Sequence, residues 1–177
     1  MGGGHDDEGE GGGGEVRFRG ALAALLPDLR AFARFLARDP AAADDLVQEA
    51  LLRALRAEAQ WRPGTSLRAW AFGILRNAFY EGRRRAGVER RVLDAVGNGA
   101  TEATPARQDG RAEVSRLGDA LARLAAPQRE ALVLVAVMGF THEEAAGVSG
   151  VAVGTLKARV SRARRALAEM AWPTTHE

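Results

Sequence analysis

The spacing of the apolar residues restricts the fold more than any other feature of this sequence. These residues recur at steps of three and four along most of the chain, as with Leu22, Leu25, Leu29 and Phe32 in residues 21–38. This spacing places apolar side chains on one face of an amphipathic helix. Aromatic residues make up only 6% of the chain, so Ala, Leu and Val supply most of the core. No segment shows a convincing strand pattern, and we therefore predict an all-α protein.

Changes in composition divide the predicted helices into two groups. Residues 1–17 are acidic and rich in glycine, which is typical of a disordered tail. Residues 87–113 are rich in Gly, Thr, Ala and Pro and lack lasting periodicity. We interpret them as a flexible linker with room for a short helical turn at residues 90–96. The remaining segments, residues 18–86 and 114–172, form two small helical bundles.

Three helices are predicted in the first bundle, over residues 21–38, 39–61 and 66–85. Asp39 followed by Pro40 suits the start of the second helix. Thr65 or Ser66 is the candidate cap of the third helix. The buried face of the second helix is predicted to comprise Leu46, Val47, Ala50, Leu51, Ala54 and Leu55.

The charged residues are nearly balanced in number but unevenly distributed. There are 25 Lys and Arg against 23 Asp and Glu. Basic residues gather in residues 83–85, 90–91 and 157–165, and acidic residues in 6–15. A local concentration of positive charge is expected of a protein that binds a polyanion.

The composition also argues against several classes of protein. The chain has no cysteine and only three scattered histidines, which excludes disulfides and cysteine-ligated metal sites. No glycine-rich phosphate-binding loop stands in the right context. We therefore expect no metal, no cofactor and no enzymatic activity. No apolar run reaches the roughly 18 residues needed to span a bilayer, and no signal peptide is present, so we expect a soluble, cytoplasmic protein.

The C-terminal part has the pattern of a helix-turn-helix. A short helix begins at Thr141, with Glu144 completing a capping box, and Gly150 permits a tight turn. A longer helix follows over residues 153–170, with an apolar stripe of Leu156, Val160, Ala163 and Leu167. In such a motif the second helix enters the major groove of DNA. Its exposed candidates for DNA contact are Gly154, Thr155, Lys157, Ala158, Arg159, Ser161, Arg162, Arg164 and Arg165.

Two blocks of this sequence resemble a known family. "DDLVQEALLRAL" and "FGILRNAFY" are similar to region 2, and "PQREALVLVAVMGFTHEEAAGVSGVAVGTLKARVSRARRAL" is similar to region 4, of extracytoplasmic-function (ECF) sigma factors of bacterial RNA polymerase. The two blocks stand in the family's order and spacing. "PGTSLRAWAFGILRN" and "GFTHEEAAGVSGVAVGTLKARV" are most similar to the EcfG-type general-stress members. The resemblance implies a sigma factor that recognises the −35 and −10 promoter elements and directs transcription of stress genes.

The resemblance also implies partners and site residues. Core RNA polymerase would bind the helix that carries Asp44, Asp45, Leu46, Gln48 and Glu49. The −10 element, locally melted, would contact Trp70, Arg76, Asn77, Tyr80, Arg83, Arg84 and Arg85. The −35 duplex would contact Gly154, Thr155, Lys157, Arg159, Ser161, Arg162 and Arg165. An anti-sigma factor of the NepR type would regulate the protein by covering the two bundles.

Within the −10 set, the residues have different expected roles. A flipped base needs a stacking surface and a polar group that reads its edge. Asn77 is the expected edge reader, because an amide both donates and accepts hydrogen bonds. Trp70 lies one turn from Ile74 on the apolar stripe, so it is either a core residue or a stacking residue. Phe79 and Tyr80 are further stacking candidates.

Two alternatives remain open from the sequence. One is a sigma mimic that only sequesters an anti-sigma factor, although a mimic would not need a basic recognition helix. The other is a simple helix-turn-helix repressor, which would not need the segment predicted to hold melted DNA. Gly147 within the short helix and Ala158 at a recognition position depart from the family pattern, which leaves the promoter sequence undetermined.

Overall fold

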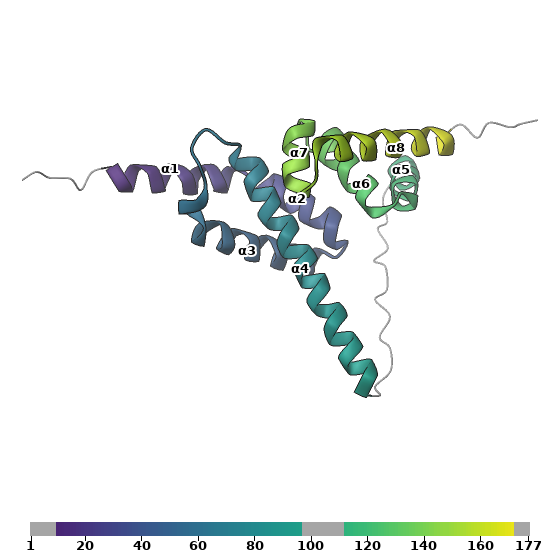
Figure 1. Ribbon diagram of the computed structural model, residues 1–177, viewed down its shortest axis with the longest axis horizontal. Helices are drawn as coiled ribbons and strands as arrows, with labels where there is room; N and C mark the ends of the chain where they lie inside the picture. Colours follow the sequence, from purple (N-terminus) through teal and green to yellow (C-terminus); the bar gives the residue numbers. More distant parts are fainter. Residues whose placement is uncertain (1–9, 97–111, 172–177) are drawn as a thin grey trace, which may run out of the picture. The chain divides into compact units, whose positions relative to one another are not determined.

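The computed structural model describes residues 10–96 and 112–171. Within these ranges all regular structure is helical, which confirms the all-α prediction (Figure 1). The chain divides into two compact units, Met1–Asn98 and Gly99–Glu177. The division falls inside the segment that was predicted to be the linker. The predicted tail up to residue 9 and linker residues 97–111 lie outside the described residues.

The first unit is built around helix α3. It comprises α1 (Glu10–Ala24), α2 (Leu26–Ala37), α3 (Pro40–Arg56), a 3₁₀ turn η1 (Glu58–Gln60) and α4 (Leu67–Val96). Helices α2 and α4 both pack on α3, and α1 packs on α2 and α4. The centre of the core is fully buried, with the rings of Phe32 and Phe72 stacked 5.1 Å apart between centroids.

The prediction of a single helix over residues 21–38 is wrong. These residues form the end of α1 and the whole of α2, with a break at Leu25. Pro27 lies in the first turn of α2. Because proline has no N–H and its ring clashes with the preceding turn, it cannot continue α1 but fits the start of a new helix.

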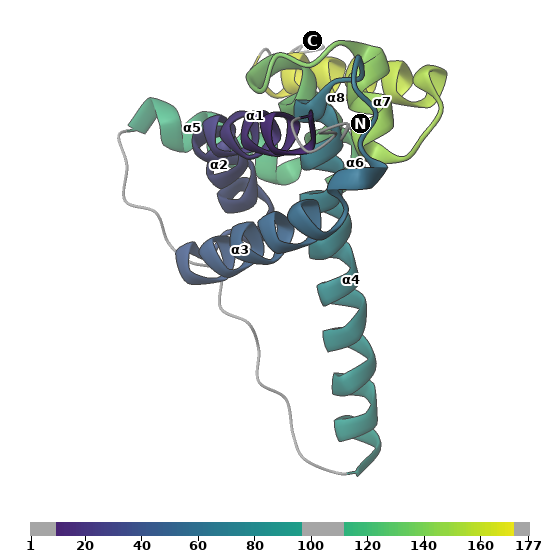
Figure 2. The same ribbon diagram turned by 90° about the vertical axis from the view of Figure 1, so that its left-hand side faces the viewer.

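Two helices run beyond their predicted ends. Helix α1 begins at Glu10, within the predicted tail, and buries Phe18 and Leu22, which anchor it to the rest of the unit. Helix α4 continues to Val96, within the predicted linker. No proline follows Ser66 before that point, and each of the three interior glycines, Gly73, Gly82 and Gly87, costs only about 1 kcal/mol relative to alanine. In Figures 1 and 2 the last part of α4 extends beyond α2 and α3.

Helix α3 begins as predicted, but its buried face is rotated. The Asp39 carboxylate accepts a hydrogen bond from the Ala42 N–H at 2.7 Å, which confirms the expected cap. The buried residues are Ala43, Val47, Ala50 and Ala54. Leu55 was predicted to be buried but is 40% exposed. Because α3 packs against both α2 and α4, small residues at the contacts allow the three backbones to approach.

The second unit is built around helix α8. It comprises α5 (Ala112–Arg123), α6 (Ala126–Leu132), a π-helical turn η2 (Val133–Val137), α7 (His142–Ser149) and α8 (Val153–Ala171). Helices α5, α6 and α7 all contact α8. The predicted apolar stripe on α8 is confirmed for Leu156, Val160 and Ala163, which are buried, while Leu167 is half-buried.

The helix-turn-helix is present in the second unit as α7, a turn and α8. The capping box is confirmed: the Thr141 hydroxyl accepts from the Glu144 N–H at 3.1 Å, and the Glu144 carboxylate accepts from the Thr141 N–H at 3.0 Å. Gly150 ends α7 in the left-handed region with φ of 64°. The Val151 N–H then donates to the Ala146 carbonyl at 3.1 Å. These local bonds set the angle between α7 and α8.

Alanine substitution at two glycines of this motif should have opposite effects. At Gly150 the left-handed backbone opposes any Cβ, so Gly150→Ala should destabilise the protein by about 1 kcal/mol. At Gly147 the backbone is helical and a Cβ would meet nothing within 4 Å, so Gly147→Ala should stabilise it by roughly 0.5–1 kcal/mol. Urea unfolding followed by circular dichroism measures both. Equal effects would contradict the described turn.

Candidate nucleic-acid interface

One face of helix α4 is buried, and the other carries most of the predicted −10 residues. The helix is capped by Ser66, whose hydroxyl accepts a hydrogen bond from the Ala69 N–H at 3.2 Å. Phe72 and Leu75 are fully buried against α2 and α3. This packing determines which side of α4 faces the core and which side faces outward.

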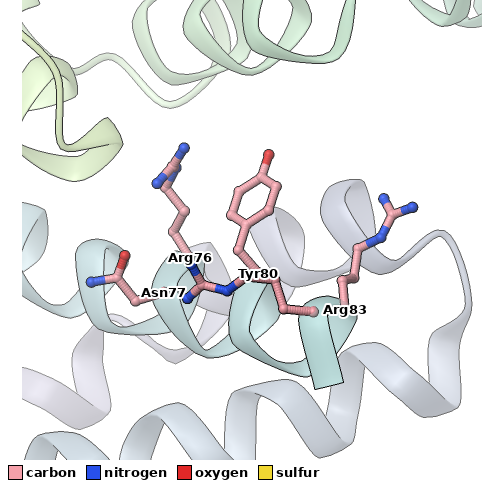
Figure 3. Close-up of a pocket in the computed structure, with 5 residues that line it drawn as sticks. Arg76, Asn77, Tyr80 and Arg83 are labelled. Carbon is pink, nitrogen blue, oxygen red and sulfur yellow. The ribbon is translucent and has the colours of Figure 1, made fainter. Parts of the chain in front are cut away.

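Five outward-facing side chains of α4 line an open pocket of about 480 Å³: Arg76, Asn77, Tyr80, Arg83 and Arg84. Ligand sites commonly have volumes in this range. Figure 3 shows Arg76 and Tyr80 projecting on the same side of the helix, with Asn77 and Arg83 flanking them. The structure thus brings together five of the predicted −10 residues in one place.

The pocket combines stacking surfaces with positive charge. The guanidinium carbon of Arg76 lies 4.6 Å from the centroid of the Tyr80 ring. The Phe79 ring meets Tyr80 edge-on at 5.2 Å, and Arg83 lies over Phe79 at 5.7 Å. Asn77 is exposed beside them. Aromatic faces, an amide and several cations are the groups that bind an unpaired base and its phosphates.

Trp70 and Arg85 do not line this pocket. Trp70 is half-buried, and its ring packs edge-on against Phe18 of α1, with 6.1 Å between centroids. Phe18 also contacts Trp61 at 5.7 Å. Trp70 therefore packs as a core residue, which is one of its two expected roles. Arg85 is exposed one residue beyond the pocket, 3.7 Å from the Glu81 carboxylate.

Arg53 joins α3 to α4 at Glu81, the residue that follows Tyr80 in α4. Its guanidinium donates to Glu49 on its own helix and to Glu81 on α4, both at 2.7 Å. The hydrogen bonds from Arg53 lower the pKa of the Glu49 and Glu81 carboxyls and raise the pKa of Arg53. The i,i+4 spacing of Glu49 and Arg53 is visible in the sequence. Nothing in the sequence indicates Glu81 as the second partner, because it lies on another helix.

The predicted polymerase-binding residues lie along α3. Asp44, Asp45, Gln48 and Glu49 are exposed, and Leu46 is half-buried. Of these, Glu49 is already bonded to Arg53. The same helix exposes two leucines that were not predicted as site residues, Leu52 (48% exposed) and Leu55. The face therefore combines acidic and apolar groups.

The predicted −35 residues lie on the outer face of α8. Arg159 is half-buried, and the others are exposed: Gly154, Thr155, Lys157, Ser161, Arg162 and Arg165. Lys157 lies 3.9 Å from the Glu143 carboxylate of α7, and Arg165 lies 3.9 Å from Glu169. These are long contacts between exposed groups, which contribute little and are screened by salt. The face is therefore available to a polyanion.

Within residues 10–96 and 112–171, no cluster of His, Asp and Glu side chains is arranged to hold a metal ion. Over the same part of the chain, no helix has both the length and the apolar character needed to cross a bilayer.

Comparison with known proteins identifies the family. The model of sigma-70 region 2 matches residues 22–88, and that of sigma-70 region 4 matches residues 115–167. The ECF RNA polymerase sigma factor EcfG of Rhodopseudomonas palustris is 45% identical over 153 residues, covering 86% of this chain and 83% of the relative. The chain belongs to the ECF sigma factors. As such, it is a transcription initiation factor whose partners are core RNA polymerase and promoter DNA.

Other relatives agree with this assignment. The ECF sigma factor SigC of Mycobacterium tuberculosis is 32% identical over 152 residues, covering 86% of this chain and 82% of that protein. Among solved structures, the sigma factor RpoE in complex with the anti-sigma factor NepR from Bartonella quintana is 40% identical, with a TM-score of 0.72. That match covers 90% of this chain and 99% of RpoE.

Removal of Arg53 should show that the stability contributed by its bonds between α3 and α4 depends on pH. The pKa of Glu49 and of Glu81 is lower in the folded state than in the unfolded state. The stability that the two carboxylates contribute is therefore fully present above their unfolded-state pKa, and it disappears as the pH falls through their folded-state pKa. Arg53→Met should therefore destabilise the protein at about pH 7 but much less near pH 3. Denaturant unfolding at both pH values measures the difference. An equal loss at both values would show that Arg53 acts through packing alone.

Proposed function

We propose that this sigma factor binds core polymerase through α3, holds a melted −10 base in the α4 pocket and reads the −35 duplex with α8. The observation that carries the proposal is the pocket itself. It places an amide, an aromatic ring and three guanidinium groups on one exposed helix face. Ordinary duplex DNA keeps its bases stacked, so only unpaired DNA offers a base to such a pocket.

At the −10 element, the side chains divide into readers and anchors. Asn77 hydrogen-bonds the edge of a flipped base, and Tyr80 offers the stacking face. Arg83, Arg84 and Arg85 neutralise the adjacent phosphates, which positions the strand without specifying its sequence. Trp70 packs against Phe18 of α1 and so helps to hold α4 in place.

At the −35 element, α8 lies in the major groove with its N-terminal end foremost. Gly154 and Thr155 stand at that end and permit close approach of the backbone to the groove floor. Lys157, Ser161 and Arg162 face the base edges, while Arg159 and Arg165 reach phosphates.

Regulation and cellular context follow from the relatives. The structure of RpoE with NepR, at 40% identity, supports an anti-sigma factor of the NepR type as a partner of this protein. Similarity to EcfG supports a role in the general stress response. Because its partner is RNA polymerase, the protein acts in the cytoplasm. It acts by binding polymerase and DNA.

The observations favour this proposal over a sigma mimic or a repressor. The structure of the anti-anti-sigma factor PhyR with NepR is only 17% identical to this chain, which shows a shared fold and no more. The identity to sigma factors reaches 45%. A mimic has no use for the basic face of α8, and a repressor has no use for a pocket that holds unpaired bases.

Run-off transcription tests the proposal directly. The purified chain is combined with core RNA polymerase on a general-stress promoter and on the same promoter with a scrambled −10 element. We expect a transcript only from the intact promoter. A chain that fails to bind core polymerase would overturn the proposal.

Loss of the Asn77 amide should separate transcription from polymerase binding. Asn77 is exposed and supports no core contact, so Asn77→Ala should fold normally. Transcription should fall about tenfold, as expected for the loss of base-edge hydrogen bonds worth roughly 1–2 kcal/mol. Affinity for core polymerase, measured by fluorescence anisotropy, should remain unchanged. A parallel loss of core affinity would contradict the assignment.

Loss of two cations from α8 should weaken recognition of the −35 element. Lys157→Ala with Arg162→Ala should reduce promoter affinity and lower the slope of log affinity against log salt by up to about two. The double variant Arg30→Ala, Arg34→Ala removes the same charge from the exposed face of α2 and serves as the control. Competition between promoters with intact and altered −35 elements measures selectivity. Unchanged selectivity in the α8 variant would refute the groove assignment.

A further inference from the structure

The stacking face of Tyr80 is occupied in this structure by a side chain of the protein itself. The Arg76 guanidinium lies 4.6 Å from the Tyr80 ring centroid. The edge of Phe79 approaches the same ring at 5.2 Å. Figure 3 shows Arg76 and Tyr80 projecting together from α4 into the pocket. A base that stacks on the Arg76 side of Tyr80 must therefore take the place of this guanidinium.

The neighbouring arginines do not share this position. Arg83 lies over Phe79, at 5.7 Å from its centroid, and Arg68 lies over Phe72 at 5.4 Å on a part of α4 outside the pocket. Tyr80 is half-buried, so it is accessible from the pocket. Arg76 combines a contact with an accessible pocket ring and a position beside the exposed Asn77 amide.

We propose that Arg76 holds the place of an unpaired nucleobase on Tyr80 and moves to a phosphate when the base arrives. This inference rests on the proposed function of the pocket. A planar guanidinium and a planar base use the same aromatic face, so the two contacts exclude one another. Base stacking on an aromatic side chain is worth more than an exposed cation–π contact. The displaced guanidinium then gains a charge-assisted bond to the strand.

The exchange makes Arg76 both a competitor of the base on Tyr80 and a partner of the phosphate. A phosphate backbone without a base can attract Arg76 but offers nothing to take its place on Tyr80. A base without its phosphate offers no new partner for the displaced cation. Only a nucleotide with both groups completes the exchange. Because the base must first displace Arg76, the exchange lowers the preference of the pocket for a base-bearing strand over a bare phosphate backbone.

The composition of the chain allows a direct test, because Tyr80 is its only tyrosine. Full-length protein labelled with ¹³C in the tyrosine ring gives NMR signals from Tyr80 alone. In the free protein, Arg76→Gln should shift these signals. Arg30→Gln, which removes an exposed cation from α2, should leave them in place. Identical spectra for Arg76→Gln and wild type would overturn the proposed contact.

Two short single-stranded DNAs then separate the base from the phosphate. One carries thymine and adenine bases, and the other is an abasic strand of the same length. At low salt we expect both to bind, but only the base-bearing strand should shift the Tyr80 signals. In Arg76→Gln both affinities should fall, whereas the ratio of base-bearing to abasic affinity should rise about two- to fivefold. Tyr80→Phe should keep the preference for the base-bearing strand, and Tyr80→Leu should abolish it.

The outcomes distinguish this inference from the function on which it rests. A lower or unchanged affinity ratio in Arg76→Gln would mean that the base does not replace Arg76, and would overturn the inference. The inference would also be overturned if neither strand bound, or if the base-bearing strand left the Tyr80 signals unshifted. Core binding and run-off transcription are measured on the same preparation. If these are intact, only the exchange has failed; if core binding is absent, the proposed function itself has failed.

Discussion

The two hydrogen bonds of Arg53 hold the outer face of α4 in the position on which the pocket depends. Burial of Phe72 and Leu75 supplies most of the binding energy between the helices, but apolar packing tolerates small rotations and shifts. The Arg53 guanidinium is bonded at 2.7 Å to Glu49 on α3 and to Glu81 on α4, and these directional bonds tolerate much smaller rotations and shifts of the helices. Glu81 also directly follows Tyr80 in α4. The ion pair therefore contributes orientation more than stability, and it connects the acidic face of α3 to the basic face of α4.

Acidic side chains moderate both basic surfaces without neutralising them. Glu81 lies 3.7 Å from Arg85, Glu143 lies 3.9 Å from Lys157, and Glu169 lies 3.9 Å from Arg165. Such exposed contacts are weak and screened by salt. They reduce repulsion among the arginines while the protein is free, and a phosphate can replace them at little cost.

Local signals in the sequence predicted local structure well, and tertiary contacts explain the rest. The capping box at Thr141 and the turn at Gly150 depend on residues a few positions apart, and both were predicted correctly. The break at Pro27 carried an equally local signal, which the apolar periodicity of residues 21–38 obscured. In contrast, the contact of Phe18 with Trp70 joins helices far apart in the chain, and no spacing rule reveals it. The exposure of Leu55 likewise depends on which face of α3 meets two neighbouring helices at once.

The two proposed DNA-binding surfaces differ in what they offer to duplex and melted DNA. In the proposed function, the α8 face is a preformed rod that fits a groove, so it binds the duplex before any base pair opens. The α4 pocket gains its main contact only from an unpaired base, through stacking worth about 1–3 kcal/mol. Displacing Arg76 from Tyr80 subtracts about 0.5–1 kcal/mol of cation–π energy. The remainder, from about 0 to 2.5 kcal/mol, is available to the melted state alone, and at its upper end it shifts the balance between closed and melted DNA by a factor of roughly seventy. A binding protein can thus favour strand opening without hydrolysing anything, because it stabilises one of two states that DNA already samples.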